Sequence, residues 1–332
     1  MQSCASAATI AVPNVAKRLL PMTTVYTSKS TCIYENLAIE EAIFRSHDLE
    51  KNGEALLLWS NKPAVVIGRH QNPWLEANVK YCLDNSIDVA RRHSGGGTVY
   101  HDLGNLNVSI LTSQARHCRP RNLQLIASSL NKALGISSIM ANNRDDLLLM
   151  PDQCKISGTA ARISHGRAYH HFTVLVNITL DVLRCALRSS LKDRVETNAT
   201  RSVPAKCVGY LAQSVPTVTV PQVHEIIMQA FCGQFHESKL VEMNTGELLY
   251  NSTPSLRPLI SKNYELLRSE DWIFHKTPKF DFRIYEDNNP DTFKEDYNDK
   301  ICVDRGRITK SSHVAFPLDE CFQKCLKGSQ FY

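Results

Sequence analysis

The chain has 332 residues, of which 43% are hydrophobic and 21% are charged, and this globular composition excludes general disorder. A domain takes roughly 100 to 200 residues, so the length allows two domains, each with its own core. A formal charge of +5 is too small to indicate binding to nucleic acid, and apolar runs such as 55–59 are far shorter than the ~20 residues that cross a membrane.

The first 34 residues are basic and contain no Asp or Glu, whereas Ser, Thr and Ala are frequent. Organellar transit peptides share this composition, and the segment lacks the continuous apolar core of a secretory signal. We therefore expect a mitochondrial transit peptide over residues 1–23 and a fold that begins near Thr23. The alternative is an ordinary disordered tail.

The spacing of apolar residues predicts short strands interrupted by helices over the first half of the chain. Asn36 can cap a helix in which Leu37, Ile39 and Ile43 alternate with charged residues, which is typical of an amphipathic surface helix. The further elements expected here are strands at 55–60 and 64–68 joined by a turn, a helix at 79–85, strands at 87–91 and 106–110, the last one half-buried, and a helix at 123–134 that stops at Gly135.

The second half continues this pattern, with gaps of turn length and irregularly placed helices that favour an α+β fold with a mixed or antiparallel sheet. Because residues 251–258 have the composition of a linker, we expect a main domain over 24–252 and a smaller one over 253–332. The elements expected here are strands at 146–149, 155–163 and 168–177, a helix at 223–235 opened by Pro221, a strand at 301–303 and a helix at 318–326.

Eleven cysteines are scattered along the chain, without a CxxC pair that could begin a zinc site. This pattern predicts free thiols in a reducing compartment. His170 and His171 are adjacent on a predicted strand, so they point to opposite faces and are not expected to share a metal. We therefore predict no metal site.

The segment 91–102, RRHSGGGTVYHD, carries the strongest indication of chemistry. Three consecutive glycines after a strand allow the backbone to approach a ligand and its N–H groups to point together at phosphate oxygens. Arg92 adds a planar and permanently charged group for the same anion. The segment suggests a phosphate or adenylate site, whereas three glycines alone are more often a flexible turn.

Two other interpretations of this segment are disfavoured. The chain has neither the GxxxxGK[ST] sequence of a P-loop nor a GxGxxG after the strand. His93, Ser94, His101 and Asp102 include the residue types of a hydrolase triad, but Ser94 lies outside any GxSxG motif. Neighbours in sequence also seldom meet as triad partners.

A second candidate segment is 155–160, KISGTA. On an alternating strand Lys155, Ser157 and Thr159 project to one face. A lysine beside glycine and small hydroxyl residues fits a site where an ammonium meets a ligand oxygen. By default, a single strand lysine is a solvated edge residue.

Three strings together resemble the lipoate-protein ligase A and lipoyltransferase family. They are VVIGRHQNPW at 65–74, RRHSGGGTVYHDLGN at 91–105, and KISGTA at 155–160 with AYHH at 168–171. The similarity extends from about Tyr34 to Lys279 and is faint beyond it.

This resemblance implies a mixed, largely antiparallel sheet of the class II synthetase and biotin ligase type, followed by a small accessory domain. It implies transfer of the lipoyl group from lipoyl-AMP to a lysine ε-amine on a lipoyl domain of a 2-oxoacid dehydrogenase E2 subunit or on the glycine-cleavage H protein. The implied setting is the mitochondrial matrix and the implied state is a monomer, without a tightly bound cofactor. Mg²⁺ is expected only if the protein also activates lipoate with ATP.

The resemblance also assigns roles to matching positions. Lys155 matches the family lysine that bridges the acyl carbonyl and the phosphate, and it is the expected catalytic residue. The match around Arg144 requires a one-residue gap near Met150. The residues expected to bind lipoyl-AMP are Arg92, Gly97, Thr98, Val99, Tyr100, Arg144, Lys155, Thr173 and Thr200.

Three alternatives stay open at this point. The acyl chain could pass through a thioester on Cys154 or Cys185, as in octanoyl-transfer relatives, although Cys154 fits a strand filler and Cys185 the buried side of a helix at 183–187. The protein could also be an ATP-dependent lipoate ligase. Finally, it could be a non-catalytic protein that sequesters lipoyl-AMP or docks lipoyl domains.

Overall fold

The computed structural model describes residues 20–246, 254–283 and 300–311. Most of the expected transit peptide, and all of the expected helix at 318–326, lie outside these residues. The first described element is strand β1 (Leu20–Ser28), which begins slightly before Thr23.

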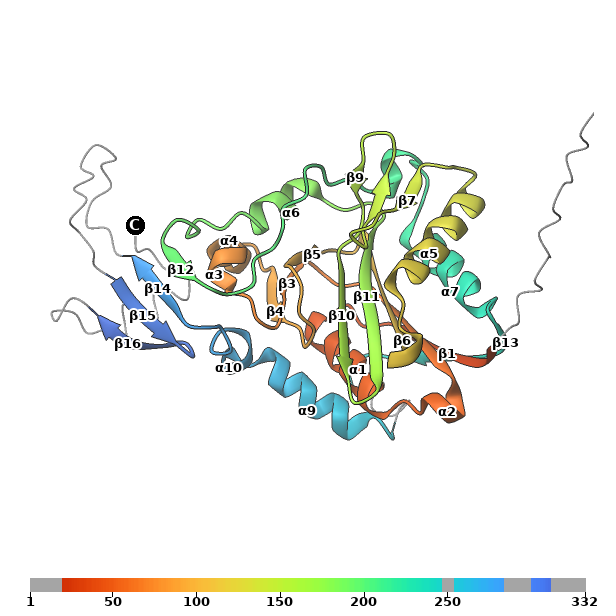
Figure 1. The fold of residues 1–332 in the computed structure, drawn as a ribbon, viewed down its shortest axis with the longest axis horizontal. Helices are drawn as coiled ribbons and strands as arrows, with labels where there is room; N and C mark the ends of the chain where they lie inside the picture. Colours follow the sequence, from red (N-terminus) through yellow and green to blue (C-terminus); the bar gives the residue numbers. More distant parts are fainter. Residues whose placement is uncertain (1–19, 247–253, 284–299, 312–332) are drawn as a thin grey trace, which may run out of the picture.

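A six-stranded mixed sheet forms the centre of the fold, in the order β10-β11-β6-β2-β1-β13 (Figure 1). Strand β1 pairs in parallel with β2 and β13, and the other neighbours are antiparallel. The expected mixed α+β fold is thus confirmed. The other strands of this sheet are β2 (Glu54–Trp59), β6 (Asn105–Ser113), β10 (Thr159–Ser164), β11 (Arg167–Leu175) and β13 (Phe235–Met243).

Helices cover both faces of this sheet. On one face α5 (Arg119–Leu134) and α7 (Val220–Cys232) contribute Ile126 and Ile227 to a hydrophobic core, and α1 (Ile33–Ser46) packs on the other face. Strand β6 is therefore buried on both sides and not half-buried as expected. Within the described residues, no helix has the length and apolar character needed to span a membrane.

Helix α1 differs from the expected surface helix. It begins at Ile33, so Asn36 lies inside its first turn, where its side chain makes buried hydrogen bonds instead of capping the helix. Glu40 and Glu41 are also buried, and each carboxylate has a partner on the central sheet, His171 for Glu40 and Arg162 for Glu41. Helix α9 (Arg257–Arg268) also packs on α1.

A second sheet of three strands carries the glycine-rich segment. Strand β3 (Ala64–Ile67) pairs in parallel with β4 (Asp88–Arg91) and antiparallel with β5 (Val99–His101), and the glycines connect β4 to β5. The expected turn after β2 therefore carries the chain from one sheet to another. Short helices accompany these strands, namely α3 (Pro73–Glu76), α4 (Val79–Asp84) and α6 (Leu180–Ala186), whereas α2 (Leu49–Asn52) packs on β1 and β2 of the central sheet.

The expected strand at 155–163 is divided into two. Strand β9 (Cys154–Lys155) forms a separate sheet with β7 (Ile139–Ala141) and β8 (Leu147–Leu149), whereas β10 belongs to the central sheet. Between them, Gly158 exchanges two hydrogen bonds with Thr173 on β11. This interruption places β9 at the edge of the site described below.

Three strands that follow α9 and α10 (Glu270–Ile273) form a four-stranded antiparallel sheet with the earlier strand β12, in the order β12-β14-β15-β16. Its strands β14 (Phe280–Arg283), β15 (Lys300–Asp304) and β16 (Arg307–Ser311) lie beyond the expected linker, but β12 (Val195–Thr197) does not. The domain boundary between residues 252 and 253 stays a prediction.

Candidate functional site

The glycine-rich segment and Lys155 lie in the wall of one cavity of about 670 Å³. The segment contributes Thr98, Val99 and Tyr100, and β11 contributes Thr173. Residues from 183–192 and 201–208 complete the wall. Two motifs that are far apart in sequence therefore meet at one ligand-sized space.

Glycine is needed in this turn because two backbone segments approach closely. Gly96 has a φ of +87°, a left-handed conformation that side chains disfavour. A Cβ atom on Gly68, directly after β3, would lie 2.2 Å from the carbonyl oxygen of Gly96. The two glycines thus allow the turn to pack against the end of β3.

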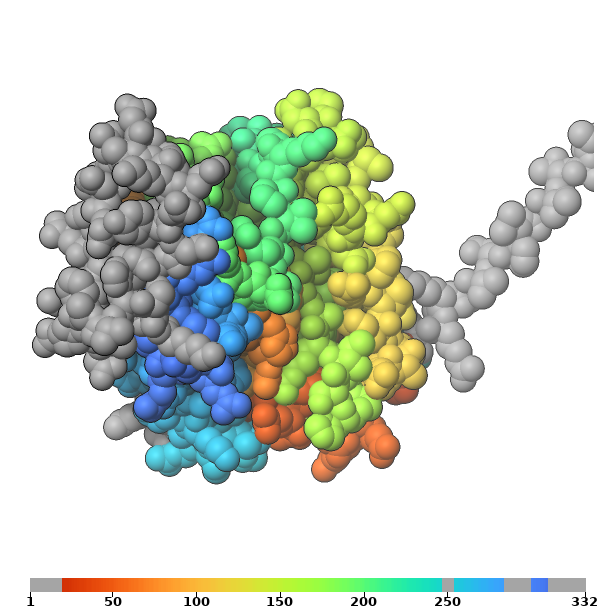
Figure 2. Space-filling view, turned by 60° about the vertical axis from the view of Figure 1, so that its left-hand side comes forward, coloured from red at the N-terminus to blue at the C-terminus, as the bar shows by residue number. Residues whose placement is uncertain are grey.

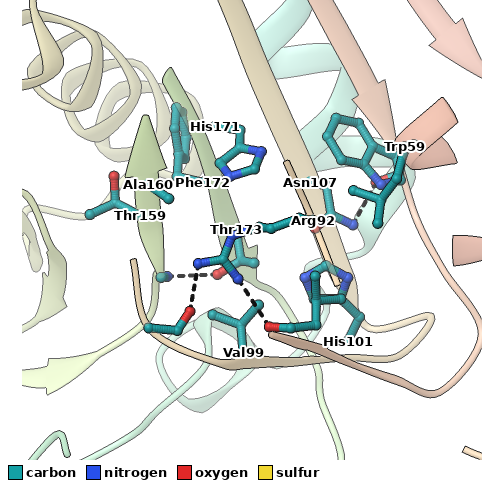
Figure 3. Close-up of a pocket in the computed structure, with 14 residues that line it drawn as sticks. Trp59, Arg92, Val99, His101, Asn107, Thr159, Ala160, His171, Phe172 and Thr173 are labelled. Carbon is teal, nitrogen blue, oxygen red and sulfur yellow. Dashed lines mark hydrogen bonds between the residues drawn. The ribbon is translucent and has the colours of Figure 1, made fainter. Parts of the chain in front are cut away.

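The buried guanidinium of Arg92 bonds the backbone of this turn (Figure 3). Its Nη2 lies 2.7 Å from the carbonyl oxygens of both Gly95 and Gly97, and its Nη1 lies 3.0 Å from that of Val66. Burial lowers the pKa of Arg92 to about 10, so the group stays charged at neutral pH. Arg92 therefore fixes the turn, and with Gly97 it lines a second, small cavity of about 40 Å³.

A chain of buried hydrogen bonds connects Arg92 to a carboxylate on α1. Arg92 Nε donates to Ser94 Oγ at 2.9 Å, Ser94 Oγ lies 2.9 Å from His171 Nε2, and His171 Nδ1 lies 3.0 Å from Glu40. Burial alone would raise the pKa of Glu40, but the adjacent His171 lowers it. Because Ser94 is only 1% exposed and its oxygen accepts from Arg92, these residues orient the turn and are not arranged to attack a substrate.

Lys155 lies at the cavity wall, where its Nζ is 2.6 Å from Asp146 Oδ1. Ser157 also lines this cavity, and its hydroxyl accepts a hydrogen bond from the amide of Leu147. Thr159 lines the small cavity instead. Only two of the three residues expected on one strand face therefore share the main cavity, because the strand is interrupted between them.

Four expected binding residues lie outside this wall: Arg92 and Gly97, which line the small cavity, and Arg144 and Thr200. Arg144 is exposed in the connection between β7 and β8 and does not belong to the described lining residues. Thr200 is exposed as well, although the residues directly after it, 201–205, line the cavity. The contacts expected of Arg144 and Thr200 with the nucleotide stay predictions.

The cavity wall also carries an excess of positive charge that the motifs did not reveal. Glu76 is the one acidic residue among the described residues of the wall, where it accepts from the amide of Ser202 and pairs with Arg201, and Arg184 pairs with Asp181 outside the wall. Such a wall favours an anionic ligand. The motif at 155–160 identified Lys155, whereas the other cations of the wall are irregularly spaced in sequence, so no motif could have identified them; they are Arg184, Arg188, Lys192 and Arg201.

Arg91, which sequence analysis left without a role, connects the site to the C-terminal part. Its fully buried guanidinium donates to carbonyl oxygens of residues 68–71 and 272–273 and to the hydroxyl of Thr277. Burial lowers the pKa of Arg91 to about 10. Only the folded chain brings these segments together, so no local sequence pattern marks this role.

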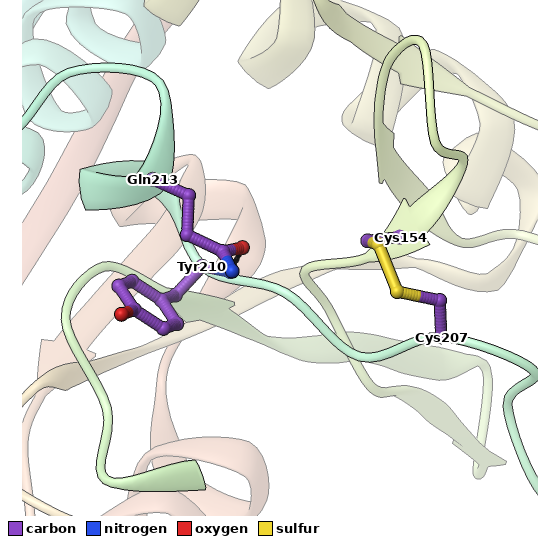
Figure 4. The surroundings of a disulfide bond; sticks show 4 residues. All are labelled: Cys154, Cys207, Tyr210 and Gln213. Carbon is purple, nitrogen blue, oxygen red and sulfur yellow. Dashed lines mark hydrogen bonds between the residues drawn. A yellow bond between two sulfur atoms is a disulfide. The ribbon is translucent and has the colours of Figure 1, made fainter.

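A disulfide joins Cys154, directly before Lys155, to Cys207 (Figure 4). The expectation that the cysteines are free thiols is wrong for this pair, because the fold brings together positions 53 residues apart. While bonded, Cys154 has no thiol to carry an acyl group. Cys185 is free but exposed, so its expected place on the buried side of a helix is also wrong.

Comparison with known proteins identifies a family with this arrangement. Residues 32–232 match the family model described as the lipoyl protein ligase A/B catalytic domain. The mitochondrial lipoyl amidotransferase LIPT1 of Homo sapiens is 39% identical over 253 residues, which cover 76% of this chain and 65% of that protein. The chain thus spans slightly less than two thirds of this relative.

Solved structures agree with this match. LipL1 of P. falciparum, in complex with lipoate, superposes with a TM-score of 0.65 at 23% identity, and the match covers 80% of this chain and 82% of that one. A lipoate-protein ligase A bound with ATP superposes with a TM-score of 0.57 at 26% identity, covering 77% and 98%. The fold is therefore that of a lipoate-protein ligase.

Proposed function

Because the chain belongs to the lipoyl protein ligase A/B catalytic-domain family, we propose that it transfers a lipoyl group from lipoyl-AMP to the ε-amine of a lysine on a lipoyl domain. The observation that carries this proposal is the single cavity that is lined both by residues 98–100 of the glycine-rich segment and by Lys155. Its volume of about 670 Å³ is typical of small-molecule sites. Leu175 and Leu187 in the wall offer apolar surface to the acyl chain, and the cations suit the phosphate.

Charge stabilisation explains how these residues would act. Attack of the amine on the acyl carbon places negative charge on the carbonyl oxygen and releases AMP. A cation directed at both oxygens stabilises this transition state more than the ground state. We assign this role to Lys155, whose ammonium Asp146 holds at the wall.

The other expected residues divide into two groups. Thr98, Val99, Tyr100 and Thr173 line the main cavity and would contact lipoyl-AMP directly. Arg92 and Gly97 would act on the ligand through the turn, because the guanidinium is bonded to the carbonyl oxygens of that turn.

Partners and location follow from the family assignment and the composition. The proposed acceptors are lipoyl domains of 2-oxoacid dehydrogenase E2 subunits and the glycine-cleavage H protein, and the proposed working form is a monomer. The basic, acid-poor N-terminus and the mitochondrial human relative support the mitochondrial matrix as the location. Lipoyl-AMP is the proposed donor, and Mg²⁺ would be needed only for activation of lipoate by ATP.

The proposal is tested by mixing the purified chain with lipoyl-AMP and an isolated lipoyl domain and following the mass of the acceptor. We expect Lys155→Ala to fold but to transfer at least about a hundredfold more slowly, since loss of one such donor costs about 2.7 to 4 kcal/mol of barrier. Lys132→Ala, on the exposed surface of α5, is a matched control with an unchanged rate. Near-normal single-turnover transfer by Lys155→Ala would refute the role of Lys155, and no transfer by the natural chain would refute the function.

The same assay separates the alternatives. Replacing lipoyl-AMP by lipoate, ATP and Mg²⁺ tests whether the chain is also a complete ligase. A mass increase of the enzyme itself would reveal a thioester intermediate. We expect no such increase, because Cys154 is bonded to Cys207 and Cys185 lies outside the described residues of the cavity wall.

A further inference from the structure

The segment 201–208 forms part of the cavity wall and runs past both motifs of the site. Arg201, Ser202, Val203 and Val208 all line the cavity, together with the residues between 203 and 206. Residues 203–206 are exposed and belong to no helix or strand. In Figure 2 the green chain near residue 200 is visible at the surface, beside the blue C-terminal strands. The shape of this wall therefore depends on how the segment is held at its two ends.

Ser202 holds the first end against the glycine-rich turn. Its hydroxyl accepts from the amide of Thr98 at 2.8 Å and from the side chain of Gln71 at 3.0 Å. Its own amide donates to the carboxylate of Glu76 at 3.1 Å. All three partners are fixed, since Gln71 and Glu76 are buried and Thr98 adjoins β5.

The disulfide and two backbone hydrogen bonds hold the second end against Lys155. The amide of Lys155 donates to the carbonyl oxygen of Cys207 at 2.9 Å, and the amide of Gly209 donates to the carbonyl oxygen of Lys155 at 3.1 Å. The Cys154–Cys207 bond adds a covalent tie at the same point (Figure 4). Opening this bond would leave the hydrogen bonds in place, so the chain would stay folded while the wall gained freedom.

We propose that Cys154–Cys207 is a reversible redox site that sets the affinity of the cavity for its acyl-adenylate, an inference that rests on the proposed function. Both cysteines are half-buried at the rim and not enclosed in the core, so a small dithiol can reach them. One thiolate of the dithiol attacks a sulfur of the bond and forms a mixed disulfide, and its second thiol resolves it. Two electrons and two protons pass to the cysteines, and the dithiol becomes a disulfide.

The bonded state is the high-affinity state, because the wall is then ordered before the ligand arrives. In the reduced state, ligand binding must order residues 203–206 again. Because Ser202 and the carbonyl oxygen of Cys207 stay hydrogen-bonded at the two ends, we expect the order to be regained to amount to about one residue of backbone, which corresponds to a factor of about five to thirty in an equilibrium constant. We therefore expect reduction to raise KM for lipoyl-AMP by about this factor, and to leave kcat unchanged because Lys155 keeps its backbone pairing and its ion pair with Asp146.

The test uses the full chain, equilibrated with dithiothreitol or with oxidised glutathione, and measures KM and kcat for transfer from lipoyl-AMP. Differential alkylation followed by mass spectrometry reports the state of each cysteine in the same samples. The double variant Cys154→Ser/Cys207→Ser should have the KM of the reduced natural chain under both conditions. Any difference in KM between the two redox conditions that persists in this variant comes from reduction of the cyclic disulfide of the lipoyl group in the substrate. Cys185→Ser, which removes an exposed free thiol, is the matched control and should respond as the natural chain does.

Two results would overturn the redox site. One is an unchanged KM in samples where alkylation shows that the bond has opened. The other is two free thiols at positions 154 and 207 after treatment with oxidised glutathione. Absence of transfer in both redox states would refute the proposed function instead. The redox site would then be judged from the affinity for lipoyl-AMP, measured by calorimetry in the same two states.

Discussion

Acidification from pH 7.5 to pH 5 should destabilise the folded chain, because three histidines around the site are buried in their neutral form. Burial lowers the pKa of His93 to about 4, that of His101 to about 3 and that of His170 to about 2. His93 packs on Trp272 with ring centroids 4.7 Å apart, and His101 lines the small cavity beside Arg92. The ring of His170 lies 2.6 Å from the hydroxyl of Thr159, which lines the same small cavity, so the three rings belong to the framework that supports the site.

The direction of this change in stability follows from the number of protons that the folded and unfolded states bind. A histidine in the unfolded chain has a pKa near 6.5, so below this pH the unfolded state binds more protons and the free energy of unfolding decreases. Each ring contributes about 2 kcal/mol between pH 6.5 and pH 5, which gives about 6 kcal/mol for the three. This is comparable to the whole stability of a typical domain. Carboxylates such as Glu40 lose their contribution below a pH of about 4.3, outside this window.

Urea unfolding followed by circular dichroism at pH 7.5, 6.5, 5.5 and 5 measures this loss. The variant His101→Gln removes one of the three titrating rings, and its stability should fall by about 2 kcal/mol less over the same range. A free energy of unfolding that changes by less than about 1 kcal/mol between pH 7.5 and pH 5 would refute the assignment of neutral, buried rings. If the free energy of unfolding decreases by the same amount in the natural chain and in His101→Gln, the contribution of about 2 kcal/mol assigned to His101 is refuted.

Three further substitutions probe the framework of the site. Arg91→Lys keeps the charge but cannot reproduce the planar set of hydrogen bonds, so we expect a loss of at least about 3 kcal/mol in urea unfolding; an unchanged midpoint would contradict this. Gly68→Ala places a methyl group 2.2 Å from the carbonyl oxygen of Gly96, so the glycine-rich turn must shift. We expect the variant to fold but to have a higher KM for lipoyl-AMP. Kinetics equal to those of the natural chain would count against the close approach of the two glycines. Glu40→Gln should slow transfer about tenfold, because it weakens the series of hydrogen bonds that connects Glu40 to Arg92. Glu41→Gln on the same helix should lower stability but leave the transfer rate unchanged. Equal transfer rates in the two variants would show that this series of hydrogen bonds has no effect on transfer.

Local sequence patterns predicted the elements whose signals are themselves local. The helix that ends at Leu134 is one example, since Gly135 adopts the left-handed conformation, with a φ of +66°, that a helix stop requires. The pairing of the glycine-rich turn with Lys155 in one cavity came from the family resemblance. Spacing and composition alone suggested only a phosphate site.

Predictions failed where distant segments decide the environment of a residue. Glu40 and Glu41 have the spacing of exposed residues, yet α9 and β11 cover the helix that carries them, and no signal in that helix reports this packing. The disulfide partner of Cys154 lies 53 residues away, at a spacing that has no sequence signature. Apart from Lys155, the cavity cations are likewise scattered over α6 and the loops that follow it, so their combined charge at the wall becomes visible only after folding.

The contacts of Arg91 have a consequence for the order in which the molecule is made. Trp272, one of its acceptors, is synthesised 181 residues after it. The ribosome therefore releases the loop at 68–71 and Arg91 long before residues 272–273, which bind the same guanidinium, have been made. Passage through an organellar import channel would impose the same delay. A nascent or half-imported chain would hold an unfinished pocket, and competence to engage an acyl-adenylate would arise only when residues 272–277 have emerged.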